Sequence, residues 1–167
     1  HKLSSDKNGF CYFLGRPRRF GKSLFLSSLE CFFNARKDLF EGLKIMELEE
    51  KWTKYEVLRF DLSGCSKVED LKDKISGALR SYETKYGYKA LDETVGARFA
   101  TLIKTAAKEE PQRIVVLFDE YDSALQQTIY NEVEHEKMRD FYRAFFAILK
   151  SESHYIFKIF LTGIMKF

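Results

Sequence analysis

A glycine- and arginine-rich stretch decides how the rest of the sequence is interpreted: Gly15-Arg16-Pro17-Arg18-Arg19-Phe20-Gly21-Lys22-Ser23. Before it lies the apolar run Phe10–Leu14, whose length and following Gly/Pro turn predict a buried strand. After it, Lys22–Phe33 has the length of a helix and is apolar on most sides, which predicts burial on most faces. The stretch therefore forms the connection between a strand and a helix.

This context matches a phosphate-binding loop, which has the form G-x-x-x-x-G-K-[S/T] between a strand and a helix. Backbone N–H groups and the positive helix end receive phosphate oxygens, the lysine reaches the β- and γ-phosphates, and the Ser or Thr hydroxyl joins the Mg²⁺ shell. Gly21, Lys22 and Ser23 fit, but Arg16 occupies the first-glycine position and Gly15 lies one residue early. The alternative is a chance Gly-Lys-Ser match at a helix start; the flanking strand and helix favour phosphate binding.

Strand-like and helix-like segments alternate along the rest of the chain. Strands are predicted at Val57–Leu62, Ile114–Phe118 and Tyr155–Leu161, and helical stripes at 68–86, 99–106 and 138–149. Ser66 to Glu69 has the spacing of a capping box at the start of the first stripe. Alternation of this kind, with central strands apolar on both faces, predicts an α/β fold in which helices cover a parallel sheet. Ligands in such sheets bind beyond the carboxyl ends of the strands.

Two adjacent carboxylates, Asp119 and Glu120, follow the most apolar of these strands. An apolar strand that ends in Asp-Glu is typical of nucleoside triphosphatases, in which the Asp orients Mg²⁺ and the Glu polarises the attacking water as a general base. The alternative is a solvated acidic turn, since Asp122 follows closely. The phosphate loop earlier in the chain favours the catalytic interpretation.

Polar residues also end the other strands. Thr162 follows the last predicted strand, where it could sense the γ-phosphate or position the water, or simply terminate the strand. Asp61 ends the second strand and could equally cap a turn or a helix.

The composition argues against several classes of protein. The net charge of +3 comes from 28 Lys and Arg against 25 Asp and Glu, a balance too even to predict nucleic-acid binding by itself. The three cysteines are widely spaced and the three histidines scattered, which argues against a disulfide framework and a zinc site. No apolar run approaches the roughly 18 residues of a membrane helix. We expect a cytoplasmic protein that does not span a membrane.

Segments distributed over nearly the whole chain together resemble one family, and they are Arg16–Ser23, Phe40–Leu43, Leu58–Ser63, Val116–Asp122 and Leu161–Gly163. The chain is similar to the AAA-ATPase-like proteins, mostly bacterial proteins that often carry a PD-(D/E)XK nuclease-like domain after the ATPase. An arginine at the first-glycine position is typical of that family, whereas Gly15 stands where the family often has Ser.

The resemblance implies a P-loop NTPase fold of the AAA-like (ASCE) type, a three-layer sandwich around a mostly parallel sheet. It implies that residues 1–167 form a single ATPase-like domain, the N-terminal part of a larger protein. The last strand, a helical lid and a C-terminal domain would then follow Phe167.

The resemblance also implies roles for individual residues. It assigns Lys22 and Ser23 to phosphate and Mg²⁺, Asp119 to Mg²⁺, Glu120 to the base and Thr162 to the sensor. The nucleotide is expected to contact the loop and the start of the helix, which are Arg16, Pro17, Arg18, Arg19, Phe20, Gly21, Lys22, Ser23 and Leu24.

The function expected from these features is an ATP-binding module, an Mg²⁺-dependent ATPase that hydrolyses the β–γ bond to drive or gate an attached domain. One alternative is a nucleotide-dependent switch or scaffold with little turnover. Another is a nucleic-acid-binding domain that uses Arg16, Arg18 and Arg19. Expected partners are ATP and ADP, nucleic acid through the C-terminal domain, and a second copy of the chain in a homo-oligomer. Selectivity for adenine over guanine stays open.

Overall fold

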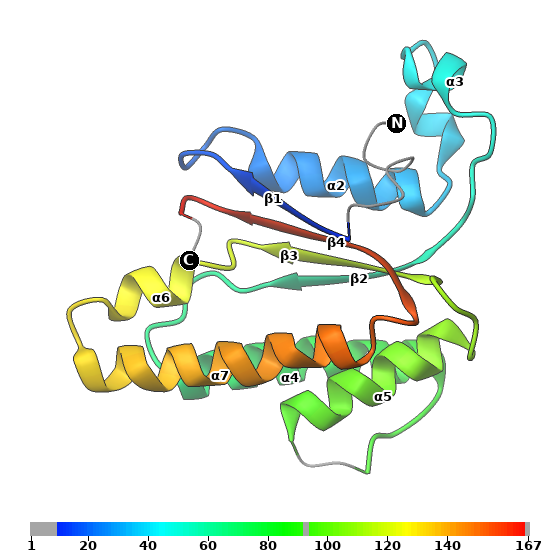
Figure 1. The fold of residues 1–167 in the computed structure, drawn as a ribbon. Coiled ribbons are helices and arrows are strands. Elements are labelled where there is room, and N and C mark those ends of the chain that lie inside the picture. The colour runs from blue at the N-terminus through cyan, green and yellow to red at the C-terminus, as the bar shows by residue number, and fades with distance from the viewer. Residues whose placement is uncertain (1–9, 92–93, 166–167) are drawn as a thin grey trace.

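The computed structural model describes residues 10–91 and 94–165. Within them, four parallel strands form one sheet in the order β1-β4-β3-β2. The strands are β1 (Cys11–Gly15), β2 (Glu56–Asp61), β3 (Ile114–Asp119) and β4 (Ile156–Gly163). Figure 1 shows that their carboxyl ends meet at one edge. The expected α/β class is confirmed, and the described sheet is entirely parallel.

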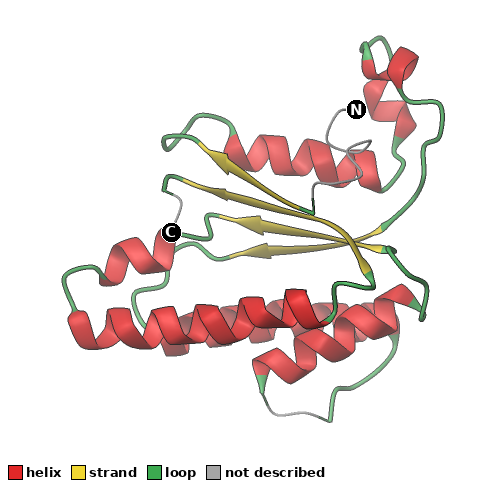
Figure 2. Ribbon diagram, in the orientation of Figure 1, coloured by secondary structure: helices red, strands yellow, loops and turns green. Residues whose placement is uncertain are grey.

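Helices cover both faces of the sheet, so the fold has three layers (Figures 1 and 2). Helix α2 (Lys22–Phe33) lies on one face, and α4 (Val68–Tyr86), α5 (Val95–Ala107) and α7 (Glu132–Ser151) lie on the other. The short elements η1 (Lys37–Phe40) and α3 (Ile45–Leu48) follow α2, and α6 (Ser123–Thr128) follows β3. None of the helices in this described part is long and apolar enough to cross a membrane.

The connections that follow the strands leave the sheet on different faces. The chain leaves β1 through α2 on one face, whereas β2 and β3 continue through helices on the opposite face (Figure 1). Ligands in open α/β sheets bind beyond the carboxyl ends of the strands. The loop between β1 and α2 and the residue after β3 both lie at this edge.

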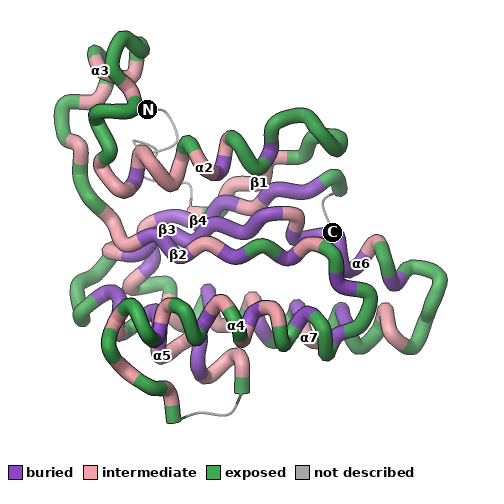
Figure 3. Tube along the Cα trace, turned by 180° about the vertical axis from the view of Figure 1, so that it is seen from behind, coloured by how far each residue is buried: buried purple, intermediate pink, exposed green. Residues whose placement is uncertain are grey.

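The core is built on β3, which is buried at every position (Figure 3). On the side of α4, α5 and α7, four phenylalanine rings pack together, namely Phe60, Phe99, Phe118 and Phe145. The side facing α2 has a smaller cluster that includes Leu26, Phe33 and Phe160. The β-branched and apolar run of β3 therefore anchors both layers of the core.

Three local expectations are wrong. Strand β1 is only partly buried because it pairs with one strand, β4, in the described sheet. Helix α2 is also less buried than its composition suggested: Leu24 is 73% exposed, because the helix packs on the sheet through one side only. The capping box is absent, since Lys67 is the N-cap of α4 and the Val68 N–H donates instead to Glu134 Oε1, at 2.9 Å.

Truncation of the central aromatic cluster should strongly destabilise the fold. Phe118 is fully buried and packs against Phe60, Phe99 and Phe145, so Phe118→Ala should lower the free energy of unfolding by about 3–5 kcal/mol. Urea denaturation measures this change, and Phe118→Leu should give a smaller loss if the alanine variant does not fold. Tyr130→Ala, at a fully exposed ring, is the control and should stay within about 0.5 kcal/mol of the parent. Equal losses in the Phe118 and Tyr130 variants would contradict this packing.

Candidate functional site

A buried carboxylate marks the centre of the carboxyl edge. Asp119, the last residue of β3, is 5% exposed. The Thr162 hydroxyl donates to its Oδ1 at 2.6 Å, and Arg59 Nη2 lies 3.5 Å from its Oδ2. The two partners come from the strands on either side, because β3 lies between β2 and β4. The carboxylate is therefore held on both of its oxygens.

Glu120 follows with an unusual backbone conformation. Its φ is +49°, in the left-handed region, and its N–H donates to Thr162 Oγ1 at 3.2 Å. Thr162 is fully buried, so one hydroxyl joins Asp119 and Glu120. A left-handed conformation costs about 1–2 kcal/mol for a residue with a side chain. The turn at Glu120 also separates the two carboxylates, since Asp119 is buried while Glu120 is half-buried.

The loop between β1 and α2 is tied to the same edge. The Arg16 N–H donates to the Gly163 carbonyl at 3.1 Å, which joins the start of the loop to the end of β4. Lys22 is 5% exposed, and its Nζ donates to the carbonyls of Arg16 at 3.1 Å and Pro17 at 3.2 Å. The ammonium group therefore points back into the loop. Gly21 precedes the helix with φ +73°, a conformation that glycine adopts without strain.

The remaining loop side chains are exposed. Arg16, Arg18 and Arg19 form no ion pair within residues 10–91 and 94–165, so the intradomain pairing considered from the sequence is not seen there. Ser23 is exposed at the start of α2, as expected for a residue available to a ligand. Phe20 and Leu24 are 63% and 73% exposed. The structure thus brings Lys22, Ser23, Asp119, Glu120 and Thr162 to one edge of the sheet.

Arg59 is a site residue that sequence reasoning gave no role. From β2 its Nη1 donates to Ser27 Oγ at 2.9 Å and lies 3.0 Å from Glu30 Oε2, both on α2. Its Nη2 lies 3.5 Å from the Ser23 carbonyl, the same distance as from Asp119 Oδ2. One guanidinium therefore joins the helix after the loop to the buried carboxylate.

Asp122 is the second residue whose role was missed. It is 1% exposed, and its Oδ2 accepts the N–H groups of Ile164 and Met165, both at 2.8 Å. This carboxylate therefore holds the chain after β4 against the turn after β3. The alternative of a solvated acidic turn is wrong for Asp122, because its carboxylate is buried and accepts backbone hydrogen bonds from the chain after β4.

Asp61 acts as a turn cap, one of the roles considered for it. Its Oδ1 accepts the Ser63 N–H at 2.9 Å, and Lys74 Nζ lies 2.8 Å from its Oδ2. Partial burial works to raise the pKa of Asp61, but the hydrogen bonds from Lys74 and Ser63 outweigh it and leave the pKa below its ordinary value. The carboxylate is therefore ionised and already paired at neutral pH.

The contact between Gly163 and Asp122 makes this end of β4 sensitive to an added methyl group. A Cβ at position 163 would meet Asp122 Oδ1 at 2.5 Å and Cγ at 2.8 Å, so Gly163→Ala should lower the free energy of unfolding by about 1–3 kcal/mol. Gly77→Ala is a matched control, because its Cβ would meet nothing within 4 Å and the position is in α4. That variant should gain about 0.5–1 kcal/mol. Thermal or urea denaturation measures the stability of both variants. Equal stabilisation of the two variants would contradict the close contact between Gly163 and Asp122.

Comparison with known proteins agrees with the motifs. A family model described as "Predicted AAA-ATPase" (AAA-ATPase-like) matches residues 2–167. A protein of Azotobacter chroococcum mcd 1, described as an "Uncharacterized protein in vnfD 5'region", is 33% identical over 173 residues. That alignment covers 97% of this chain and 34% of the relative, so the chain spans about a third of the relative's length. No solved structure matches the chain. Since the family model covers nearly every residue, as the motifs predicted, the chain belongs to the predicted AAA-ATPase family.

Proposed function

We propose that this chain is an ATP-binding module with a P-loop NTPase fold and that it hydrolyses the β–γ phosphate bond with Mg²⁺. The observation that carries the proposal is the hydrogen-bonded series Glu120–Thr162–Asp119 beside a loop that holds a buried lysine. Membership of a predicted AAA-ATPase family supports it. In the same proposal, residues 1–167 are the ATPase unit, and turnover drives or gates an attached domain.

Lys22 would bind the transferred phosphate. Its ammonium now donates to two neutral carbonyl oxygens, those of Arg16 and Pro17. A phosphate oxygen is a stronger acceptor than a carbonyl oxygen, because its negative charge adds Coulomb attraction to a hydrogen bond whose donor is already ionised. We infer that Lys22 turns from the loop carbonyls to the phosphate. The N–H groups at the start of α2 and the positive end of that helix would hold the other phosphate oxygens.

Ser23 and Asp119 would hold the magnesium ion. A hydroxyl and a carboxylate are suitable oxygen ligands, and Mg²⁺ usually takes one or two protein ligands together with phosphates and water. No group of three His, Cys, Asp or Glu side chains gathers within the described ranges, which suits an ion that shares its ligands with a phosphate chain. When bound, the ion would neutralise charge on the phosphates. Arg59 would keep the Asp119 carboxylate oriented, since it lies 3.5 Å from Oδ2.

Glu120 would act as the general base. Its side chain is half-buried, and its backbone is held in the left-handed conformation by the bond to Thr162. A base must be fixed within reach of the water that it polarises, and a hydrogen-bonded backbone provides that fixed geometry. Thr162 would couple the phosphate to both residues, because its hydroxyl contacts the Asp119 carboxylate and the backbone N–H of Glu120.

A nucleotide-dependent switch with little turnover is the second candidate. The bonds from Lys22 to the loop carbonyls favour it, since nucleotide would have to replace them and would thereby change the loop. A nucleic-acid-binding role for Arg16, Arg18 and Arg19 is the third, and it requires an affinity that falls steeply as salt rises. The exposure of these side chains is compatible with it.

Nucleotide binding should depend on Lys22. With Mg²⁺ present, ATP or ADP at about 100 times its dissociation constant should stabilise the chain by about 2.7 kcal/mol, measured as a shift of the melting temperature. Lys22→Ala should abolish the shift, whereas Lys51→Ala, at an exposed lysine outside the loop, should retain it. A GTP arm tests base selectivity. If no nucleotide shifts the melting temperature of the parent, the binding proposal fails for this chain.

Turnover should depend on Glu120 more than binding does. Glu120→Gln should keep the ATP-dependent shift but slow phosphate release by about 10²–10⁴-fold, the usual contribution of a general base. Glu132→Gln is the matched control at an exposed glutamate on α7 and should leave the rate unchanged. An unchanged rate in Glu120→Gln would remove its assignment as base. Binding without turnover in the parent would select the switch.

A further inference from the structure

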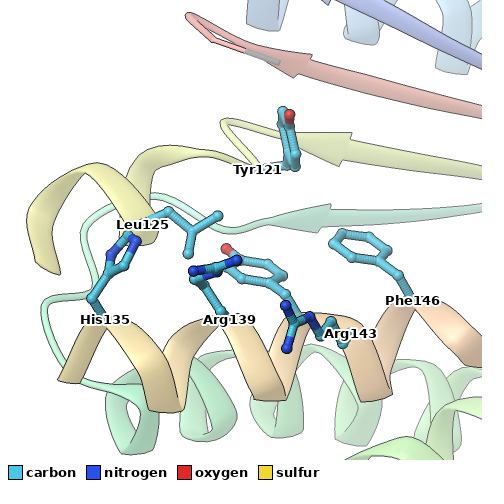
Figure 4. A pocket seen from close by; sticks show the side chains of 7 residues that line it. Tyr121, Leu125, His135, Arg139, Arg143 and Phe146 are labelled. Atoms are coloured by element: carbon cyan, nitrogen blue, oxygen red, sulfur yellow. The ribbon is translucent and has the colours of Figure 1, made fainter. Parts of the chain in front are cut away.

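A cavity lies on the face of the sheet opposite α2. It has a volume of about 500 Å³ and lies between α6, α7 and the turn after β3 (Figure 4). Three aromatic rings line it, those of Tyr121, Tyr142 and Phe146, together with the nitrogen-bearing side chains of His135, Arg139 and Arg143. Figure 4 shows His135, Arg139 and Arg143 along one side of α7, below Tyr121. None of these residues belongs to the proposed nucleotide site.

An unsatisfied hydroxyl lies in the wall of this cavity. Tyr142 is 5% exposed, and its hydroxyl has no hydrogen-bond partner among the residues that the structure describes. Its ring stacks on Phe146 with centroids 5.4 Å apart, which fixes its position. Burial, the main cause, raises the pKa of Tyr142, so the hydroxyl stays protonated and can donate. A buried polar group without a partner costs about 1–3 kcal/mol, and a ligand acceptor would remove that cost.

The charged side chains that line the cavity are the two arginines, Arg139 and Arg143. Arg139 forms no ion pair within the described ranges. Arg143 pairs with Asp140 at 3.2 Å, but both side chains are about two-thirds exposed, at 69% and 65%, so the pair is weak. Among the residues that the structure describes, no acidic side chain lines the cavity. The lining is therefore complementary to an anionic group.

The surface beside the cavity is apolar. In the connection from α6 to α7, Tyr130 is fully exposed and Ile129 is 53% exposed, and Val133 at the start of α7 is 66% exposed. Thr128 Oγ1 lies 3.0 Å from His135 Nδ1, which holds this connection next to the cavity wall. Exposed apolar side chains beside an arginine- and tyrosine-lined cavity are typical of protein interfaces rather than of sites for small anions.

We propose that this cavity binds an acidic peptide segment of a partner protein. A Glu or Asp carboxylate of the segment pairs with Arg139 and Arg143 and accepts the hydrogen bond of Tyr142. A neighbouring aromatic or aliphatic side chain packs between the rings of Tyr121 and Phe146, and Ile129 and Tyr130 extend the contact. This site does not depend on nucleotide binding at Lys22.

A random peptide library displayed on phage, panned against the whole chain, tests the proposal. We expect enrichment of sequences that combine Asp or Glu with an aromatic or large aliphatic residue. A fluorescent copy of the most enriched peptide should bind Arg139→Glu about tenfold or more weakly, while Arg80→Glu, at an exposed arginine of α4, binds as the parent does. Tyr142→Phe should weaken binding about fivefold without lowering the melting temperature, because it removes only the unpartnered hydroxyl.

Several outcomes would overturn the proposal. They are a library without enrichment, enrichment without acidic residues, and a peptide that binds the Arg139→Glu and Tyr142→Phe variants as tightly as the parent. Arg139-dependent binding of inorganic phosphate or of phosphatidylserine vesicles, with no peptide enriched, would assign the cavity to that ligand instead. Lys22→Ala separates this proposal from the nucleotide site: it should bind the peptide normally, and loss of binding would place the peptide at the loop.

Discussion

The charge of Asp119 sets the main physical constraint on this domain. A carboxylate at the end of a wholly buried strand loses most of its hydration, at a cost of several kcal/mol unless it is paired and hydrogen-bonded. Both compensating groups come from other strands, Thr162 from β4 and Arg59 from β2. The carboxylate therefore requires all three strands in register. The contacts that stabilise this buried charge also set the geometry of the candidate site. Loss of Thr162 or Arg59 would therefore affect both the stability of the fold and the geometry of the site.

Contacts at this edge also constrain the loop between β1 and α2, and α2 itself, which lies on the opposite face of the sheet from α7. Arg59 connects Asp119 with α2, and the backbone bond from Arg16 to Gly163 connects the loop with β4. The chemically capable groups thus lie on ends of regular elements, while the arginine-rich part of the loop projects into solvent. Strand and helix ends hold side chains more accurately than free loops do, which suits a site that works by positioning charge.

The parts of the fold that the sequence predicted are those with strong periodicity. The apolar run of β3 and the stripe of α4 are local signals, and their observed bounds differ little from the predicted ones. Helix α6 was not predicted, because its six residues are too short to show a helical period. The predicted capping box does not form because of a tertiary contact: Glu134, which is distant in the sequence, accepts the Val68 N–H at the start of α4. Arg59 could not be found because its partners become neighbours only when strands and helix assemble.

Glu120 carries a further consequence for how this chain could vary. A left-handed backbone at a residue with a side chain is a local strain that glycine or asparagine would relieve. Selection for thermal stability alone would therefore favour replacing the very residue proposed as the base. If Glu120 is the base, stability and turnover oppose each other at this one position. Under the proposed role, variants with glycine or asparagine at position 120 would gain thermal stability and lose the base, whereas stabilising changes in the aromatic core would leave the base in place.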